Sequence, residues 1–251
     1  MKLRNDKIII FGGGSGIGKA IGKRFCDVGA KVLITGRNAE KLQNAAEEIN
    51  RENIYYKAFD ITNVKEHIAL FNEATEILGG LNGFVNAAAL GTGQYTGRGY
   101  EPWDITEEEW DTLTDINFKS AFFLMRNEID YMTANGIRGN ILNIASNAAC
   151  MDIIGSYGAS KEAIIRWTRA LGKKYGHNGI IINGIAPGAT FTPMISSYAH
   201  DINQKYERHA IERFIRPDEI AELAYYLMSD YGEIVCGHTV VADGGDNAAT
   251  L

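Results

Sequence analysis

The stretch KIIIFGGGSGIG, residues 7–18, decides the fold of this chain. Its first five residues form an apolar, β-branched run, which predicts a buried strand. A glycine-rich turn follows at once, and a helical pattern of apolar residues runs from Ile17 to Val28. Glycines permit a tight turn and let the backbone approach a phosphate at the amino-terminal end of a helix. The stretch therefore predicts a strand–turn–helix unit that binds a nucleotide; its plainer interpretation is a tight turn alone.

The same alternation of short apolar runs and longer helical patterns continues along the chain. Apolar runs predict seven strands, at 7–11, 31–35, 54–58, 83–86, 140–144, 180–186 and 238–241. A 3.6-residue periodicity predicts helices at 17–28, 40–50, 64–78, 107–133, 157–175 and 217–229. Unbroken apolar strands are typical of a parallel sheet covered on both faces. We predict one doubly wound α/β domain, residues 1–251, with seven parallel strands and right-handed crossovers.

Composition indicates a globular protein and excludes several other classes. Of 251 residues, 45% are apolar and 22% charged, and 25 basic against 31 acidic side chains give a net charge of −6. A net negative charge argues against a nucleic-acid-binding protein, because phosphate binding needs a basic stripe on the surface. No apolar run has the length of a membrane span or a signal peptide. Cys26, Cys150 and Cys236 are few and far apart, which fits a reducing compartment, so we expect a cytoplasmic protein.

The glycine turn differs from two well-known phosphate-binding patterns. A Walker-type loop needs Gly-Lys followed by Ser or Thr, but Ala20 follows Gly18 and Lys19 here. The spacing Gly12-x3-Gly16-x-Gly18 also differs from GxGxxG. The turn therefore needs a different explanation.

Tyr157 and Lys161, four residues apart, give the strongest indication of chemistry. Residues with this spacing share one face of a helix, so both side chains would point into one site. The pKa of a free tyrosine is about 10, and a nearby cation favours the phenolate and lowers that pKa. Such a tyrosine acts as a general acid in carbonyl reduction and as a general base in alcohol oxidation. A lone YxxxK also occurs as a plain helix face, so its place after the fifth predicted strand matters.

Together, these motifs resemble the short-chain dehydrogenase/reductase family over essentially the whole chain. The family's TGxxxGxG turn is matched at residues 11–18, with Phe11 in the place of threonine. The resemblance implies a Rossmann-type fold and a catalytic tetrad of Asn117, Ser146, Tyr157 and Lys161. In that tetrad the Tyr is the acid and base, the Lys lowers its pKa and binds the nicotinamide ribose, the Ser polarises the carbonyl, and the Asn holds a water for proton relay. Ser146 is preferred to Ser156 for the serine role.

The resemblance also implies which residues bind a nicotinamide cofactor. Gly36 stands where NAD-preferring relatives carry an acid, and Arg37 offers a guanidinium to a 2′-phosphate. We therefore expect NADP(H) to be preferred to NAD(H); the alternative is that Arg37 is a solvated surface charge. The expected cofactor contacts are Gly12, Gly14, Ser15, Gly16, Ile17, Gly18, Arg37, Asp60, Ile61, Asn86, Tyr157, Lys161, Pro187, Gly188, Thr190 and Thr192. No metal is expected, because the histidines at 67, 177, 200, 209 and 238 lack metal-ligand spacing.

Two segments without clear periodicity, 89–104 and 189–214, follow predicted strand ends, the edge where α/β sheets bind ligands. We interpret 189–214 as a substrate lid; the alternative is a plain surface loop. Its apolar side chains Phe191, Met194, Ile195, Tyr198 and Tyr206 suggest a partly apolar pocket, which Cys150, Met151 and Asp152 would help to shape. Within the lid, His200 and His209 are candidates to reach the substrate.

The chain departs from the family in the turn after its fourth predicted strand. The family's NNAG reads Asn86-Ala87-Ala88-Ala89 here, which loses a side-chain amide that ties the central strands together in relatives. Phe11 likewise removes a hydroxyl near this turn. The two losses are expected to affect cofactor affinity rather than proton transfer.

The sequence thus predicts an NADP(H)-dependent oxidoreductase acting on a small carbonyl or secondary alcohol. One specific alternative is a 3-oxoacyl-carrier-protein reductase, which would need a basic patch beside the site. From other classes, the alternatives are a non-catalytic cofactor sensor and a purely structural subunit; retention of Tyr157 and Lys161 argues against both. By analogy with the family we expect a homotetramer, or else a dimer, joined through the predicted helices 107–133 and 157–175.

Overall fold

One parallel sheet forms the centre of the computed structural model, which describes residues 2–98, 103–151 and 155–247. Its strands are β1 (Lys7–Phe11), β2 (Lys31–Gly36), β3 (Ile54–Ala58), β4 (Gly83–Asn86), β5 (Gly139–Ile144), β6 (Ile180–Pro187) and β7 (Thr239–Ala242). They lie in the order β3-β2-β1-β4-β5-β6-β7, and all neighbours run parallel. The order reverses between β1 and β4, where a doubly wound sheet opens a crevice at its carboxyl edge. The predicted fold class is confirmed.

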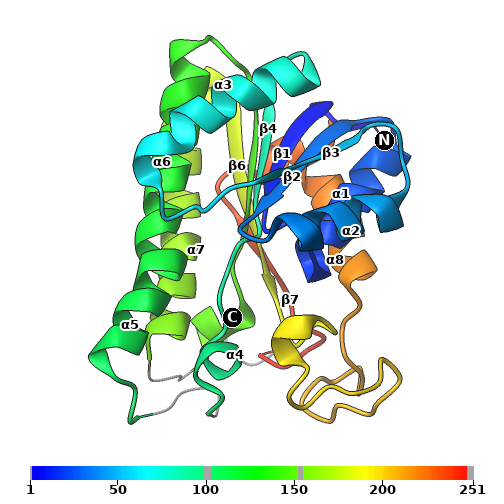
Figure 1. Ribbon diagram of the computed structural model, residues 1–251, viewed down its shortest axis with the longest axis vertical. Coiled ribbons are helices and arrows are strands. Elements are labelled where there is room, and N and C mark those ends of the chain that lie inside the picture. Colours follow the sequence, from blue (N-terminus) through cyan, green and yellow to red (C-terminus); the bar gives the residue numbers. More distant parts are fainter. Residues whose placement is uncertain (1, 99–102, 152–154, 248–251) are drawn as a thin grey trace.

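Helices cover both faces of this sheet (Figure 1). They are α1 (Gly16–Asp27), α2 (Ala39–Ile49), α3 (His67–Leu78), α4 (Thr92–Thr96), α5 (Glu107–Thr114), α6 (Ala121–Ala134), α7 (Ser156–Tyr175) and α8 (Pro217–Leu227). Short 3₁₀ turns, η1 and η3 to η6, span Val64–Glu66, Asn147–Cys150, Gly176–Asn178, Pro193–Ile195 and Gly232–Val235. One face carries α1, α2 and α8, and the other carries α3, α6 and α7. Within the described ranges, no helix is both long enough and apolar enough to cross a bilayer.

The alternating side chains of the strands supply two separate cores. On β1, Ile8 and Ile10 pack with residues of α1, α2 and α8, whereas Ile9 and Phe11 pack with residues of α3 and α6. Successive side chains of a strand point to opposite faces, so an unbroken apolar strand fills both cores. Phe11 is fully buried, and its ring meets Phe71 edge-to-face at 6.3 Å. Phe11 therefore replaces the family's threonine with an apolar contact beneath the glycine turn.

The helix predicted at 107–133 contains a π-helical turn. This turn, η2 (Asp115–Ser120), directly follows α5 and directly precedes α6. Asn117 in this turn accepts a hydrogen bond from the Leu90 N–H (2.9 Å) and donates one to the Leu90 carbonyl (2.7 Å). A residue whose amide binds a remote backbone leaves the regular helical ladder, and one extra residue enters the turn. The predicted helix is therefore present, and its π-helical turn lies at Asn117, a feature that periodicity does not record.

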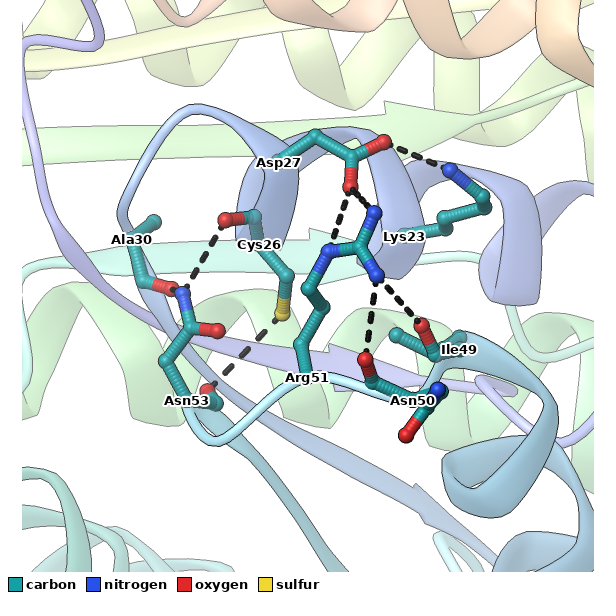
Figure 2. A network of polar contacts seen from close by, with 8 residues as sticks. All are labelled: Lys23, Cys26, Asp27, Ala30, Ile49, Asn50, Arg51 and Asn53. Atoms are coloured by element: carbon teal, nitrogen blue, oxygen red, sulfur yellow. Dashed lines mark hydrogen bonds and ion pairs between the residues drawn. The ribbon is translucent and has the colours of Figure 1, made fainter.

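A polar network joins the turn between α1 and β2 to the turn between α2 and β3, at the amino-terminal edge of the sheet (Figure 2). The Asn53 side-chain amide donates to the carbonyls of Cys26 (3.1 Å) and Ala30 (2.5 Å), which joins the start of β3 to the turn between α1 and β2. Arg51 forms an exposed ion pair with Asp27 at 2.8 Å. These contacts stabilise the scaffold at the edge opposite the carboxyl ends of the strands.

We expect Asn53→Ala to lower the free energy of unfolding by about 1–3 kcal/mol, because two partly buried carbonyls lose their donor. Arg51→Ala is the matched control, since exposed ion pairs contribute at most about 1 kcal/mol. Urea unfolding followed by circular dichroism measures both. Equal losses in the two variants would contradict this assignment.

Candidate active site

A cavity of about 870 Å³ lies at the carboxyl edge of the sheet, the size of a cofactor or ligand site. In Figure 1 this is the lower edge, where α4 and the segment after β6 lie. Residues predicted to bind the cofactor or to act in catalysis line it as follows: Gly12, Gly14, Ser15, Gly16, Ile17, Gly18, Arg37, Asp60, Ile61, Ser146, Tyr157, Lys161, Pro187, Gly188, Thr190 and Thr192. Two predicted residues lie outside the lining: Asn117 binds Leu90, and Asn86 binds Glu128 and Asn143.

The glycine turn forms a close-fitting cradle at the start of α1. Gly12 has φ +81°, and a Cβ there would lie 2.7 Å from the Cα of Ala88, while a Cβ on Gly18 would overlap the Gly12 carbonyl. Ser15, at the N-cap of α1, makes no side-chain capping hydrogen bond. The helix therefore presents free backbone N–H groups to the cavity, the arrangement that binds a phosphate. These residues fit the pyrophosphate of a dinucleotide.

Two cations border the cavity beyond β2. Arg37 is exposed and follows Gly36, which carries no carboxylate. Lys41 lies in the first turn of α2, which Asn38 caps through a hydrogen bond to the Lys41 N–H (2.8 Å). Across the described residues, neither cation has an ion-pair partner within 4.0 Å. The sequence analysis did not predict Lys41 as a cofactor residue. Asn38, a preferred N-cap residue three positions earlier, was the signal that places Lys41 in the first turn of a helix after β2.

The candidate reactive groups lie on α7 and just after the end of β5, in the lining of the cavity. Tyr157 is 6% exposed and Lys161 is 2% exposed. The Tyr157 hydroxyl lies 4.0 Å from the Met194 sulfur. Lys161 Nζ donates to the Ile144 carbonyl (3.1 Å) and lies 5.6 Å from the centre of the Tyr157 ring. Both side chains face one site, as their spacing on α7 predicts.

Burial sets the proton affinities of this pair. Burial raises the pKa of Tyr157 to about 12, against the smaller, opposite effect of a hydrogen bond with Ser146. Burial also lowers the pKa of Lys161 to about 8. Desolvation is the largest influence on the pKa of Tyr157 in this cavity, and the lowering of that pKa by Lys161 stays a prediction. Tyr157 therefore keeps its proton at neutral pH, as a general acid requires.

Ser146 is the serine that faces the site. It lines the cavity, and its hydroxyl accepts a hydrogen bond from the Ala148 N–H at 3.2 Å. Ser156, the rejected alternative, is buried and is not part of the lining. Of the neighbouring pocket residues proposed from sequence, Met151 lines the cavity, Cys150 does not, and Asp152 falls outside the described residues.

The segment 189–214 has a small core of its own beside the cavity. The Tyr206 ring stacks on the buried Phe214 at 4.6 Å, and Phe191 packs against the same cluster. Met194, Ile195, Tyr198 and Tyr206 line the cavity, whereas Phe191 does not.

The histidines proposed to reach the substrate lie elsewhere. His209 is fully buried, accepts from the Ala189 N–H (3.2 Å) and donates to the Arg213 carbonyl (2.8 Å). It therefore joins the two ends of the segment, and both ring nitrogens of this candidate are engaged by the protein itself. His200 is exposed and is not part of the lining.

Polar groups that the sequence did not single out also border the cavity. The Asp246 carboxylate accepts from Asn147 (3.0 Å) and pairs with Arg208 (3.5 Å). Gln94, at the start of the segment after β4, lines the same side. Asp246 directly follows Asp243-Gly244-Gly245, whose turn carries it to the site. Among the described residues, no three His, Cys, Asp or Glu side chains gather as metal ligands.

Comparison with known proteins adds to this geometry. A family model described as enoyl-(acyl carrier protein) reductase matches residues 12–247. The chain is 32% identical to a 2,5-dichloro-2,5-cyclohexadiene-1,4-diol dehydrogenase of Sphingobium indicum, over 98% of both chains. The protein belongs to the short-chain dehydrogenase/reductase family. It is therefore an oxidoreductase of the family that uses nicotinamide cofactors on alcohol and carbonyl groups.

Three further similarities of this short-chain dehydrogenase/reductase are to a reductase, a dehydrogenase and a ketoreductase. An A-factor type γ-butyrolactone 1′-reductase of Streptomyces virginiae is 30% identical, over 97% of this chain and 96% of its own. The structure superposes with a TM-score of 0.85 on a short-chain dehydrogenase of Bacillus anthracis, 30% identical over 96% of each chain. A polyketide ketoreductase variant crystallised with NADPH gives a TM-score of 0.83 at 26% identity, over 98% of this chain and 99% of its own.

Proposed function

We propose that the protein transfers a hydride between NADP(H) and a small carbonyl or secondary alcohol. The observation that carries this proposal is the buried Tyr157–Lys161 pair with Ser146 in the same cavity as the open end of α1. Cofactor preference rests on Arg37 and Lys41, which offer two unpaired cations to a 2′-phosphate at a β2 tip without a carboxylate. The glycine cradle would hold the pyrophosphate, and Thr192 would border the nicotinamide.

The chemistry divides between cofactor and protein. The bound nicotinamide supplies or accepts the hydride. In reduction, the Tyr157 hydroxyl donates its proton to the carbonyl oxygen as negative charge develops there, and the Ser146 hydroxyl donates a hydrogen bond to the same oxygen. Protonated Lys161 stabilises the phenolate that Tyr157 then becomes. Asn117, held on Leu90 in the π-helical turn, would hold the relay water toward Lys161.

The lining favours a compact, partly apolar substrate. Met194, Tyr198 and Tyr206 offer apolar surface beside Tyr157, and Asn147 adds an amide. Both similar enzymes named above act on ring compounds, as their names state, so a cyclic ketone or alcohol is the proposed class. An acyl-carrier substrate is less favoured, because two other cations of the lining, Arg98 and Arg208, pair with carboxylates of the protein itself, and Arg37 and Lys41 are assigned to the cofactor.

The proposal is tested by measuring stabilisation by NADPH and NADH at matched concentrations, then NADPH oxidation with a panel of cyclic ketones. A ligand that binds only the folded state raises its stability by RT ln(1 + [L]/Kd). We expect the larger shift with NADPH, and turnover with at least one ketone. A shift without turnover on any carbonyl would favour the cofactor-sensing alternative.

We also propose a homotetramer. An aromatic patch crosses α5 to α7, where Trp110, Phe118 and Phe122 are 44%, 42% and 40% exposed. Trp167 meets both phenylalanine rings at 5.1 and 5.2 Å. Contiguous exposed aromatic side chains are typical of interfaces. Sedimentation should give four times the chain mass of 27.6 kDa, and Phe122→Glu should give smaller species; a monomeric wild type would contradict the proposal.

A further inference from the structure

Glu128 is a fully buried carboxyl group without a positive partner. It lies on α6, is 0% exposed, and faces the end of β4. Asn86 Nδ2 donates to its Oε2 at 3.1 Å. Within the described part of the chain, Glu128 Oε1 and Asn86 Oδ1 both lack a hydrogen-bond partner. A buried carboxylate in this setting is costly, so its environment requires an explanation.

A single proton would satisfy both unpartnered oxygens. They belong to two groups that already share one hydrogen bond, and two bare oxygens repel unless one of them carries a proton. A carboxylic acid and an amide can exchange two hydrogen bonds, one in each direction. The rest of the chain fixes the amide, because Asn86 also donates to Asn143 Oδ1 (2.8 Å) and Asn143 donates to Thr168 Oγ1 (2.9 Å).

This chain of amides joins the strands beneath the cofactor cavity. Asn86 ends β4 and is followed by Ala87 and Ala88, which line the cavity; Ala88 also abuts the Gly12 turn. On β5, Asn143 precedes Ile144, whose carbonyl accepts from Lys161. A displacement of Asn86 would therefore move both the glycine cradle and the strand that orients the catalytic lysine.

We propose that Glu128 is a positioning residue that acts as a neutral carboxylic acid, its hydroxyl donating to Asn86 Oδ1 and so holding the end of β4 under the cofactor. Its effect on catalysis rests on the proposed cofactor site. The Glu128–Asn86 pair links the central strands of the sheet. In relatives the second asparagine of the NNAG turn makes this link with its side-chain amide, and Ala87 stands in its place here.

The electrostatic surroundings agree with a neutral Glu128. Burial raises the pKa of Glu128 to about 8, against the hydrogen bond from Asn86, and no charged group contributes. On α3, His67 binds the Ile61 carbonyl and Asn127, and burial lowers its pKa. On α7, Lys161 binds Ile144. On α6 itself, Arg126 and Asp130 are exposed.

A small cavity beside Asn86 allows an alternative arrangement, in which a water molecule takes the place of the proton on Glu128. A cavity of about 20 Å³ borders Asn86 and Asn143, which is room for one water molecule. A water there could donate to Asn86 Oδ1 and leave Glu128 ionised. The two arrangements differ in the protonation state of Glu128, which can be measured directly.

The first experiment needs no cofactor. Infrared spectra of the full chain at pH 7 should contain the carbonyl stretch of a protonated carboxyl group, absent from Glu128→Gln and retained in Asp130→Asn, the exposed control on the same helix. That band should disappear as the pH rises through about 8. A spectrum of Glu128→Gln identical to wild type, with no protonated band at pH 7, would overturn the proposal.

The second experiment tests positioning through NADPH affinity, measured by fluorescence titration at pH 7 and pH 9. Wild type and Asp130→Asn should bind up to about tenfold more weakly at pH 9, because about one molecule in ten keeps the proton one unit above the pKa. Glu128→Gln should lose less affinity than wild type between the two pH values, keeping only the dependence that Lys161, with a pKa of about 8, contributes in every variant, and Glu128→Leu should bind weakly at both. Equal pH dependence in wild type and Glu128→Gln would refute the positioning role, whereas absence of NADPH binding by wild type would refute the proposed function and leave the infrared result standing.

Discussion

Tyr157→Phe should lower turnover with NADPH and a ketone by about 10³-fold, the usual contribution of a positioned general acid. The substitution removes one oxygen and leaves the buried ring in place beside Met194 and Lys161. Tyr157 keeps its proton at neutral pH and is the group proposed to transfer it, whereas Ser146 is proposed only to donate a hydrogen bond to the carbonyl oxygen. Steady-state kinetics measures the loss, and NADPH titration shows whether the cofactor still binds.

Tyr175→Phe is the matched control, since it makes the same change at the far end of α7. Its turnover should stay within about twofold of wild type, in the range of substitutions away from special features. Wild-type turnover in Tyr157→Phe would exclude the proposed mechanism. A variant that loses NADPH binding as well as turnover would instead indicate that the hydroxyl holds the cofactor.

Arg37→Ala should weaken NADPH binding by about tenfold, and Lys41→Ala by a similar factor, as expected for charge-assisted contacts that stay partly in solvent. NADH lacks the 2′-phosphate, so its affinity should change little in either variant. Lys31→Ala removes a positive charge from the other end of β2 and serves as the control. Titrations with both cofactors give the ratio of affinities for each variant.

Gly36→Asp tests the same site in the opposite direction. A Cβ at Gly36 would meet only the Leu42 side chain, at 3.7 Å, so the larger residue fits. The new carboxylate should accept hydrogen bonds from the ribose of NADH and repel the phosphate of NADPH, which should reverse the preference. An unchanged ratio of affinities in Gly36→Asp and Arg37→Ala would mean that the 2′-phosphate does not bind at the β2 tip.

Much of the fold was predictable because its signals are local. The apolar run of β1, the glycine turn after it and the fixed four-residue spacing on α7 depend on backbone geometry and on neighbours along the chain. Strand ends of a parallel sheet meet at one edge, so residues that follow different strands were expected in one cavity. The lining contains most of them, Arg37 and Ser146 included.

The features that the sequence did not indicate share a different cause. Asn117 meets Leu90 across 27 residues, and at that contact the expected helix contains a π-helical turn that the sequence pattern did not indicate. His209 was a candidate to reach the substrate, yet its two ring nitrogens bind the Ala189 N–H and the Arg213 carbonyl and so link the two ends of the segment. In both cases a polar side chain satisfies a distant backbone group, which no periodicity reveals.

The sequence by itself determined the order of strands and helices along the chain, and it predicted the phosphate-binding turn and the proton-transfer pair, since each follows from short-range spacing. Only the tertiary structure decided how those groups hold their protons. Tyr157, Lys161 and Glu128 lose water to side chains from remote segments, and that desolvation shifts their pKa values to about 12, 8 and 8. Desolvation depends on everything packed around a group in three dimensions, and for Glu128 it outweighs the opposing effect of the hydrogen bond from Asn86, 42 residues away.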